Sequence, residues 1–167
     1  MATRNIHAGC LVLGDAGTAF GAPADAGVLF IGPSGCGKSD LMLRLIAAGA
    51  TLVSDDRTDL SVADGALTAA PPAAIAGLIE IRGLGILALP YRRSARVALV
   101  VELAPDITPA RMPQHARYTP PADLVLAANA CPPLIRLNPF EFSAPAKIAA
   151  AVAGFVHGLF RETIESN

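Results

Sequence analysis

Apolar positions divide the chain into short β-type runs separated by turns rich in glycine and proline. Apolar or alternating runs of this length predict strands, and we expect them over residues 6–13, 28–31, 51–54, 59–62, 66–69, 78–81, 86–89, 97–103 and 134–137. The run Val97–Leu103 is almost wholly apolar and therefore indicates a central strand buried on both faces. Asp64 and Gly65, between two of the runs, predict a tight hairpin turn. Pro105–Pro121 is irregular and polar and predicts a long surface loop.

Two segments have a helical pattern. Lys38–Ala48 follows the strand at Val28–Ile31 and stops before Gly49, which suits a helix C-terminus. Ser143 is the candidate N-cap of a terminal helix, with Pro145 in its first turn. One stripe of that helix is apolar and predicts packing against the protein's own core, a neighbouring subunit or a protein substrate; it comprises Ile148, Val152, Phe155, Val156 and Leu159.

Composition narrows the class of protein. The 167 residues are most simply one domain spanning 1–167, and 53% hydrophobic against 16% charged residues indicate a globular chain. No apolar run reaches the roughly 18 residues of a membrane span, so we expect a cytoplasmic protein without a membrane partner. The net charge of −1 argues against a nucleic-acid partner. Cys10, Cys36 and Cys131 are widely spaced and fit neither a disulfide framework nor a zinc site.

A complete phosphate-binding loop, Gly-Pro-Ser-Gly-Cys-Gly-Lys-Ser, lies between the second predicted strand and the first helix. Its glycines let backbone amides surround phosphate oxygens, and the helix adds the positive end of its dipole. Lys38 suits the outer phosphates of a nucleotide, and Ser39 suits Mg²⁺. The sequence therefore predicts ATP and Mg²⁺ as cofactors, with a nucleotide-binding set of Gly32, Pro33, Ser34, Gly35, Cys36, Gly37, Lys38, Ser39 and Asp40.

Acidic residues supply the second candidate feature. Asp55 and Asp56 end the strand after the first helix, and in a parallel sheet this strand end shares an edge with the phosphate loop. A carboxylate there can hold Mg²⁺ through water or accept a proton from an attacking hydroxyl. Because neighbours alternate along an extended chain, we expect only one of the two to face the phosphate. Glu80 and Arg82, beside Gly83, indicate either a metal carboxylate next to a phosphate-steadying cation or an edge-strand salt bridge.

In their order and spacing the Gly-rich loop, Val53-Ser54-Asp55-Asp56 and the run Glu-Ile-Arg-Gly-Leu-Gly-Ile at 80–86 resemble the HPr kinase/phosphorylase family, with specific motifs over residues 6–89. The resemblance implies an α/β, P-loop kinase-like domain with a mixed β-sheet, a phosphate-loop helix and a C-terminal helix. It implies ATP-dependent phosphorylation of a serine of the phosphocarrier protein HPr, regulating a phosphotransferase system, with phosphorolytic dephosphorylation as the reverse. HPr would be the protein partner, and a homo-oligomer such as a hexamer the assembly.

The resemblance also implies roles for single residues. Asp55 is similar to the acid/base that takes the proton from the substrate serine. Lys38 is similar to the phosphate anchor, and Ser39 and Glu80 to the Mg²⁺ ligands. His7 matches a histidine that the family places near its active site.

Residues after the run at 80–86, which is the family's signature segment, match the family more loosely. Arg111 corresponds to a catalytic arginine of the family, with Arg117 as the competing candidate. The family's basic Pro-rich segment, associated with dephosphorylation, is here Ile135–Phe140 and holds a single arginine. This departure favours kinase over phosphorylase activity.

Two other enzyme classes share parts of the pattern. A small-molecule or nucleotide kinase has a similar phosphate loop, but its nucleoside-binding segment would stand where this chain has an aspartate pair and a hairpin. A nucleotide-dependent regulatory NTPase is supported by the apolar strand Leu99–Glu102, in which Glu102 would replace Asp55 as the metal partner.

Overall fold

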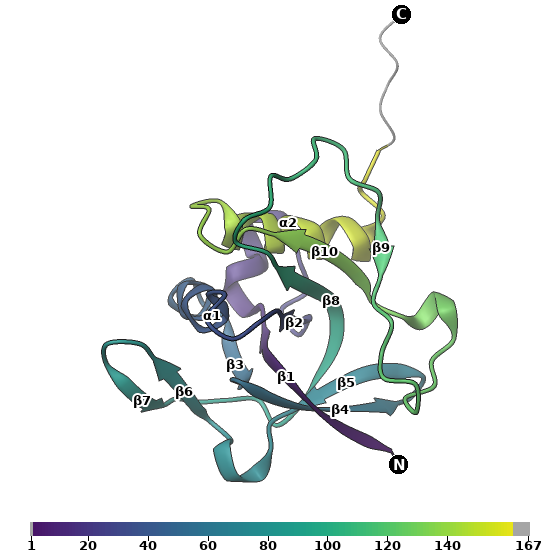
Figure 1. Ribbon diagram of the computed structural model, residues 1–167. Coiled ribbons are helices and arrows are strands. Elements are labelled where there is room, and N and C mark those ends of the chain that lie inside the picture. Colours follow the sequence, from purple (N-terminus) through teal and green to yellow (C-terminus); the bar gives the residue numbers. More distant parts are fainter. Residues whose placement is uncertain (1, 162–167) are drawn as a thin grey trace, which may run out of the picture.

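The computed structural model describes residues 2–161, and its strands form a mixed sheet with a separate small hairpin (Figure 1). The strands are β1 (Thr3–Val12), β2 (Gly27–Ile31), β3 (Thr51–Ser54), β4 (Arg57–Ala63), β5 (Ala66–Ala70), β6 (Leu78–Ile81), β7 (Gly85–Ala88), β8 (Ala95–Leu103), β9 (Ala116–Arg117) and β10 (Pro133–Leu137). The helices are α1 (Lys38–Ala47) and α2 (Ala144–His157), with 3-10 turns at η1 (Gly14–Phe20), η2 (Ala73–Ile75) and η3 (Ala128–Ala130).

The central part of the sheet runs in the order β3-β1-β2-β8-β10. Here β1 is antiparallel to both β3 and β2, whereas β8 is parallel to both β2 and β10. The first half of β1 continues into a pairing with β4, and the start of β8 pairs with β5. Since β4 and β5 pair with each other, they close over one face of the central strands.

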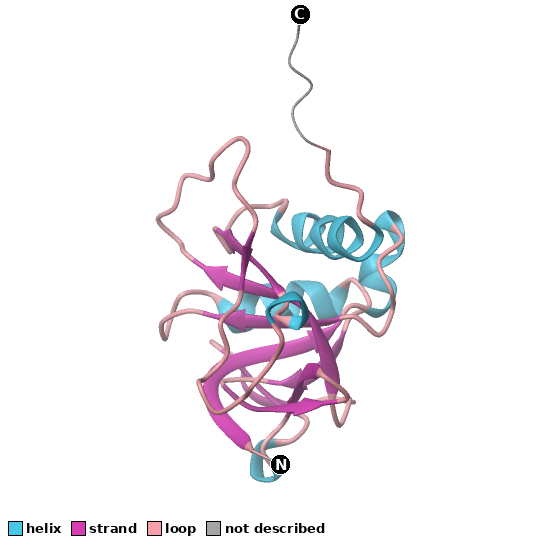
Figure 2. Ribbon diagram, turned by 90° about the vertical axis from the view of Figure 1, so that its right-hand side faces the viewer, coloured by secondary structure: helices cyan, strands magenta, loops and turns pink. Residues whose placement is uncertain are grey.

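The core follows the period-2 alternation of the central strands. Val28 and Phe30 of β2 face α1 and α2, whereas Leu29, between them, faces the layer that contains β4 and β5. All three side chains are completely buried, and burying each contributes about 1.5–3 kcal/mol. The central strands therefore lie between a helical layer and a β layer. In Figure 2 the terminal helix lies at the opposite end of the molecule from the N-terminus.

The predicted α/β class with a mixed sheet and a C-terminal helix is confirmed. Two predicted strands, 51–54 and 78–81, have the predicted bounds, and the others differ by one to three residues at one or both ends. The predicted central strand is β8, which is largely buried. Asp64 and Gly65 form the predicted turn, with φ angles of 49° and 71°. The loop predicted over Pro105–Pro121 is interrupted by β9, because Ala116 and Arg117 pair with the start of β10. Within the described residues, neither helix is long and apolar enough to cross a membrane.

The terminal helix differs from its prediction at both ends. Ser143 precedes the helix, but its side chain forms no capping hydrogen bond. Ile148 and Val152 are buried as expected, whereas Val156 and Leu159 are exposed. Leu159 lies beyond the helix, which ends at His157 before Gly158 with a left-handed φ of 63°, and Val156 lies in the last turn of the helix.

Candidate active site

Residues 32–37 join β2 to α1 as a glycine-rich loop. Gly35 and Gly37 have φ angles of 77° and 98°, which L side chains rarely adopt. The side chain of Lys38 is only 7% exposed and folds back under the loop. Its Nζ donates hydrogen bonds to the carbonyl oxygens of Gly32 (2.9 Å) and Pro33 (3.0 Å). The lysine cation is therefore fixed directly beneath the loop.

The loop leads into the N-terminus of α1. Gly37 is the N-cap residue and has no side chain to cap the helix, so the first amide groups of α1 remain available to an external acceptor. These amides and the helix dipole favour an anion at this point. The geometry suits the phosphate group that the motif predicts, and phosphate binding itself stays a prediction.

Asp55 connects the loop helix to the β6–β7 hairpin. Its side chain is 5% exposed. Ser39 Oγ donates to Oδ1 of Asp55 at 2.9 Å, and the backbone N of Glu80 donates to Oδ2 at 2.9 Å. Each carboxylate oxygen therefore has its own donor, and one side chain holds the starts of α1 and the signature segment together.

The strand order explains this contact differently from the sequence argument. From the sequence we expected Asp55 and the phosphate loop to share one edge of a parallel sheet, but β1 lies between β3 and β2 and is antiparallel to both. Two antiparallel pairings in succession leave β3 pointing the same way as β2. Asp55 therefore reaches the edge that carries the loop, although the two strands are not neighbours.

Asp56 lies beside His7 at the mouth of the same pocket. The Nε2 atom of His7 is 3.1 Å from Oδ1 of Asp56, and the Asp56 carboxylate is largely exposed. Both acids line the cavity, Asp55 beside Ser39 and Asp56 beside His7, and the expectation that only one of them faces the phosphate stays a prediction. Asp56 has a left-handed φ of 63°, which breaks the strand alternation on which the expectation rested.

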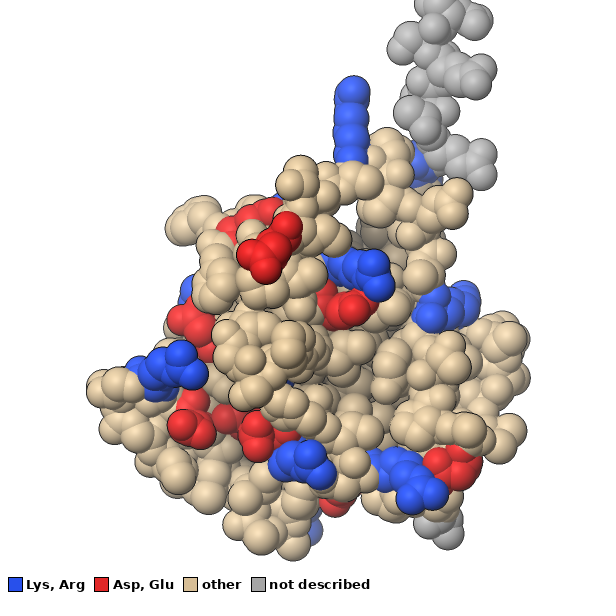
Figure 3. Space-filling view, viewed as in Figure 1, with Lys and Arg blue, Asp and Glu red and all other residues tan. Residues whose placement is uncertain are grey.

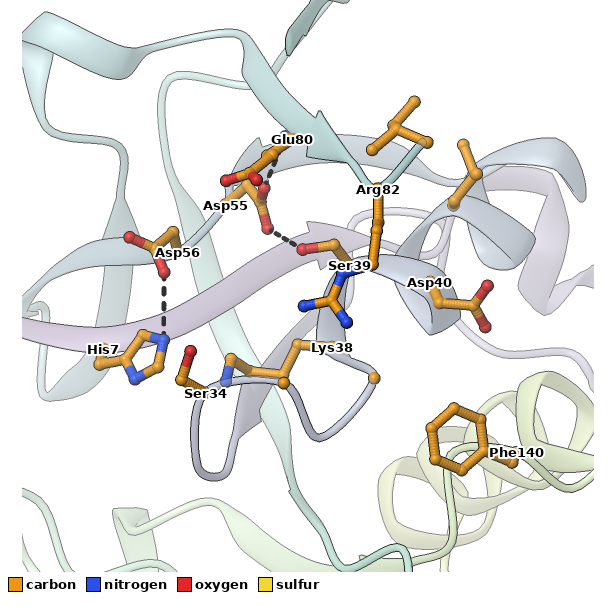
Figure 4. Close-up of a pocket in the computed structure, with 14 residues that line it drawn as sticks. His7, Ser34, Lys38, Ser39, Asp40, Asp55, Asp56, Glu80, Arg82 and Phe140 are labelled. Carbon is orange, nitrogen blue, oxygen red and sulfur yellow. Dashed lines mark hydrogen bonds and ion pairs between the residues drawn. The ribbon is translucent and has the colours of Figure 1, made fainter. Parts of the chain in front are cut away.

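These residues surround a cavity of about 400 Å³. Figure 4 shows His7 and Asp56 at one end, Lys38 and Ser39 in the middle, and Phe140 at the opposite end. The lining comes from β1, the loop and α1, the end of β3, the signature segment and the segment after β10: His7, Ser34, Gly35, Gly37, Lys38, Ser39, Asp40, Leu43, Asp55, Asp56, Glu80, Ile81, Arg82 and Phe140. Acidic and basic side chains are interspersed on this face of the molecule (Figure 3).

Most of the predicted site residues meet at this cavity. Arg82, which the sequence placed beside Glu80 as a possible phosphate-steadying cation, lines it as well. Gly32, Pro33 and Cys36 belong to the loop but do not line the cavity. Cys36 is instead buried, with its Sγ 3.9 Å from the Lys38 Nζ.

The structure does not bring the predicted catalytic arginine to the cavity. Arg111 is exposed in the segment between β8 and β9, and it is not part of the lining. The competing candidate, Arg117, donates to the carbonyl oxygen of Cys131 at 2.6 Å. Both arginines lie on the connection between β8 and β10, and Arg117 belongs to β9, which pairs with β10. Neither arginine lines the cavity beside the phosphate loop.

Glu102, the alternative metal partner, is engaged elsewhere. It lies directly opposite Arg136 in the parallel pair of β8 and β10. The Nε atom of Arg136 donates to its Oε2 at 2.6 Å. Glu102 does not line the cavity, so the geometry favours Asp55 over Glu102 as the acid beside Ser39.

Phe140 lines the cavity although the sequence analysis gave it no role in the site. In the sequence, the segment Ile135–Phe140 is notable only for its low charge. An exposed phenylalanine in a loop carries no motif, and its place beside the phosphate loop depends on contacts between residues far apart in the chain.

This chain is similar to known proteins of one family. Residues 22–106 match the family model described as the HPr Serine kinase C-terminal domain. The HPr kinase/phosphorylase of Clostridium tetani (strain Massachusetts / E88) is 44% identical over 64 residues, covering 38% of this chain and 21% of the relative. That of Aromatoleum aromaticum is 43% identical over 101 residues, covering 53% of this chain and 32% of the relative. The chain thus spans about a fifth to a third of the length of these curated relatives.

A solved structure is similar over nearly the whole chain. The Hpr(Ser) kinase/phosphatase from Coxiella burnetii superposes with a TM-score of 0.71 at 25% sequence identity, covering 93% of this chain and 98% of the solved chain. The likeness therefore extends beyond the residues of the family match, to the strands and helix that follow them.

Proposed function

We propose that residues 1–167 form one catalytic domain, which transfers the γ-phosphoryl group of ATP to a serine of an HPr-type phosphocarrier protein. The basis is that this chain belongs to the family of HPr serine kinase C-terminal domains. The transfer would regulate a phosphotransferase system. The observation that carries the proposal is the hydrogen bond between Ser39 and Asp55. It joins a phosphate loop to a buried acid in one cavity, together with Glu80 of the family's signature segment.

The nucleotide's phosphates would lie along the loop and the first turn of α1. Backbone amides and the Lys38 ammonium supply hydrogen-bond donors and positive charge there, and Arg82 adds a second cation across the cavity. Arg82 would thus have the phosphate-steadying role that the sequence indicates for it, whereas Arg111, which resembles the family's catalytic arginine, does not line the cavity.

The donor set also fits Mg²⁺. Ser39 Oγ and the carboxylate of Glu80 are hard oxygen ligands, and Asp55 orients the hydroxyl through its hydrogen bond. Among residues 2–161 no three acidic, histidine or cysteine side chains converge to form a complete metal cage. Mg²⁺ is ordinarily held by one or two protein ligands plus substrate phosphates. When bound, the ion neutralises charge on the transferring phosphoryl group.

Asp55 is the proposed acceptor of the serine proton. Each of its oxygens accepts one hydrogen bond and keeps a lone pair for a further donor. His7 and Asp56 stand at the same end of the cavity, open to solvent, where a protein substrate can present its hydroxyl. In the reverse direction the same carboxyl group would return the proton to the serine leaving group while inorganic phosphate attacks.

The direct test incubates the protein with HPr, Mg²⁺ and ATP labelled at the γ-phosphate. We expect label on a serine of HPr, a loss of about 100-fold or more with Asp55→Asn, and near-normal rates with Glu102→Gln, whose residue lies outside the cavity. ATP turnover without labelled HPr would instead indicate a small-molecule kinase or a regulatory NTPase. Adding phosphate to serine-phosphorylated HPr tests the phosphorylase direction.

We also propose a homo-oligomeric assembly, such as a hexamer. The β6–β7 hairpin supports it, because Leu84 and Ile86 leave 83% and 72% of their surface exposed, and apolar surface of this kind favours association. Light scattering on the purified protein measures the mass directly. A mass equal to one chain at micromolar concentration would contradict this proposal and leave the kinase assignment untouched.

A further inference from the structure

We infer that Phe140 forms a stacking platform for the nucleobase, at the end of the cavity opposite His7 and Asp56; the inference rests on the proposed nucleotide-dependent function. The platform would receive a purine ring while the loop holds the phosphates. It would make nucleoside triphosphates bind more tightly than bare polyphosphate, with little discrimination between bases.

The ring lies directly against the phosphate loop. A Cβ atom placed on Gly37 would come within 3.1 Å of Cζ of Phe140 and 3.2 Å of Cγ of Pro139. The phenyl group therefore packs beside the N-cap of α1, where the loop passes into the helix. It still leaves 62% of its surface exposed while lining the cavity, so an apolar face is available next to a polar, anion-binding surface.

The segment that carries the ring is anchored rather than loose. The Arg44 guanidinium of α1 donates to the carbonyl oxygens of Pro139 and, at 3.4 Å, Glu141. The backbone N of Phe140 donates to Oδ1 of Asn138 at 3.0 Å. Both neighbours of Phe140 are thus attached to the helix that begins at the phosphate loop. An aromatic group placed in advance loses little conformational freedom when a ligand stacks on it.

The order of groups along the cavity sets the direction of a bound nucleotide. His7, Asp56 and Asp55 stand at one end, the loop and Lys38 in the middle, and Phe140 at the other end (Figure 4). Transfer to a serine requires the outermost phosphate to face the acids. The inner phosphate and the nucleoside then point towards Phe140.

The surroundings of the ring favour stacking over recognition of base edges. Leu43, one turn into α1 and half-buried, adds apolar surface to the lining of the same cavity. The nearby carboxylate of Asp40 already accepts a hydrogen bond from Nε of Arg44 at 3.1 Å. Every base offers a π face, so stacking of this kind is tolerant of base identity.

The experiment measures dissociation constants of ATP, GTP and tripolyphosphate, each with Mg²⁺, by calorimetry. The variants are Phe140→Ala, Phe140→Trp and, as the matched control, Phe142→Ala; Phe142 is fully exposed and does not line the cavity. We expect Phe140→Ala to raise the Kd of both nucleotides about tenfold, or about 1.4 kcal/mol. Tripolyphosphate should change less than twofold, Phe140→Trp should restore nucleotide affinity, and Phe142→Ala should have no effect.

Two results would overturn the platform. One is unchanged nucleotide affinity in Phe140→Ala, and the other is an equal loss for tripolyphosphate, which would mean that the substitution disturbs the phosphate loop itself. Either result leaves labelling of HPr by the wild-type protein intact if the proposed function is right. Conversely, a selective loss of ATP and GTP affinity in a protein that never labels HPr would support the platform and refute the kinase assignment. Failure of the wild-type protein to bind ATP would refute both.

Discussion

Replacing Asp55 by asparagine and by alanine separates its structural role from its chemical one. The side chain accepts one hydrogen bond at each oxygen, from the Ser39 hydroxyl and from the Glu80 amide. Asparagine has a single oxygen, and the backbone N–H of Glu80 cannot reverse its direction. The oxygen must therefore stay with Glu80, and the asparagine NH₂ group must face Ser39, whose hydroxyl turns to accept.

The two variants differ in stability because they differ in what they leave without a partner. Asp55→Asn keeps both hydrogen bonds and loses only their charge assistance, so we expect it to lower the free energy of unfolding by about 1 kcal/mol. Asp55→Ala leaves the Ser39 hydroxyl and the Glu80 amide unpaired near a buried position. Each such loss costs about 1–3 kcal/mol, and because water can enter from the cavity we expect a total of about 2–4 kcal/mol.

The activity of the two variants should fall alike, by about 100-fold or more. In Asp55→Asn the Ser39 oxygen accepts from the amide, so it is no longer oriented as a ligand for Mg²⁺. Magnesium should therefore enhance ATP binding less than in the wild-type protein, whereas ATP binding without metal should remain. Urea unfolding gives the stabilities, and calorimetry with and without Mg²⁺ gives the metal dependence. Equal stability of the alanine variant and the wild type, or wild-type metal dependence in the asparagine variant, would refute this account.

Three further predictions concern other parts of the molecule. Burial raises the pKa of Cys10 from 9.0 to about 12, so stability should fall as the pH rises from about 9 towards 12, and Cys10→Ala should flatten that dependence in urea unfolding at several pH values. The hydrogen bond from Arg4 lowers the pKa of Asp123 below its ordinary 3.8. The pair's contribution to folding stability is therefore present above pH 3.8 and is lost as the pH falls. Arg4→Ala should return the pKa of Asp123 towards 3.8 in an NMR titration. Gly37→Ala and Gly65→Ala both place a side chain at a positive φ, of 98° and 71°. Gly65→Ala should cost about 1–2 kcal/mol of stability, and Gly37→Ala more, because its Cβ would also crowd Phe140 and Pro139. Only Gly37→Ala should abolish calorimetric binding of ATP, and equal binding by both variants would contradict the role of the loop.

Local patterns were enough to predict most of the fold. Strand positions follow from apolar runs, and the turn at Asp64 and Gly65 follows from a two-residue motif, because both signals lie within a few neighbouring residues. The same holds for the phosphate loop, whose glycines adopt the positive φ angles that the motif requires. The pairing of β1 with both β2 and β4 has no such local signal. It depends on a long strand that changes partners along its length.

The site was predictable where one segment supplies it and not where distant segments meet. Asp55 reaches Ser39 although the antiparallel strand β1 lies between β3 and β2, since two antiparallel pairings in succession leave β3 parallel to β2. Asp56 lines the cavity and has a left-handed backbone conformation, which the residue type alone does not predict. Arg111 matched the family only loosely, and the connection after β8 carries it away from the loop.

Phe140 illustrates how a contact between residues far apart in the chain contributes to the site. Its place depends on Arg44, which lies on the predicted phosphate-loop helix and donates to backbone oxygens on both sides of Phe140. Arginine suits this task because its planar group offers several donors in a fixed geometry, which lysine at the same position would not. One side chain of α1 thus couples the phosphate loop to the segment after β10. If Phe140 is the base platform, loss of the Arg44 guanidinium should weaken nucleotide binding at a distance, without any contact between Arg44 and the base.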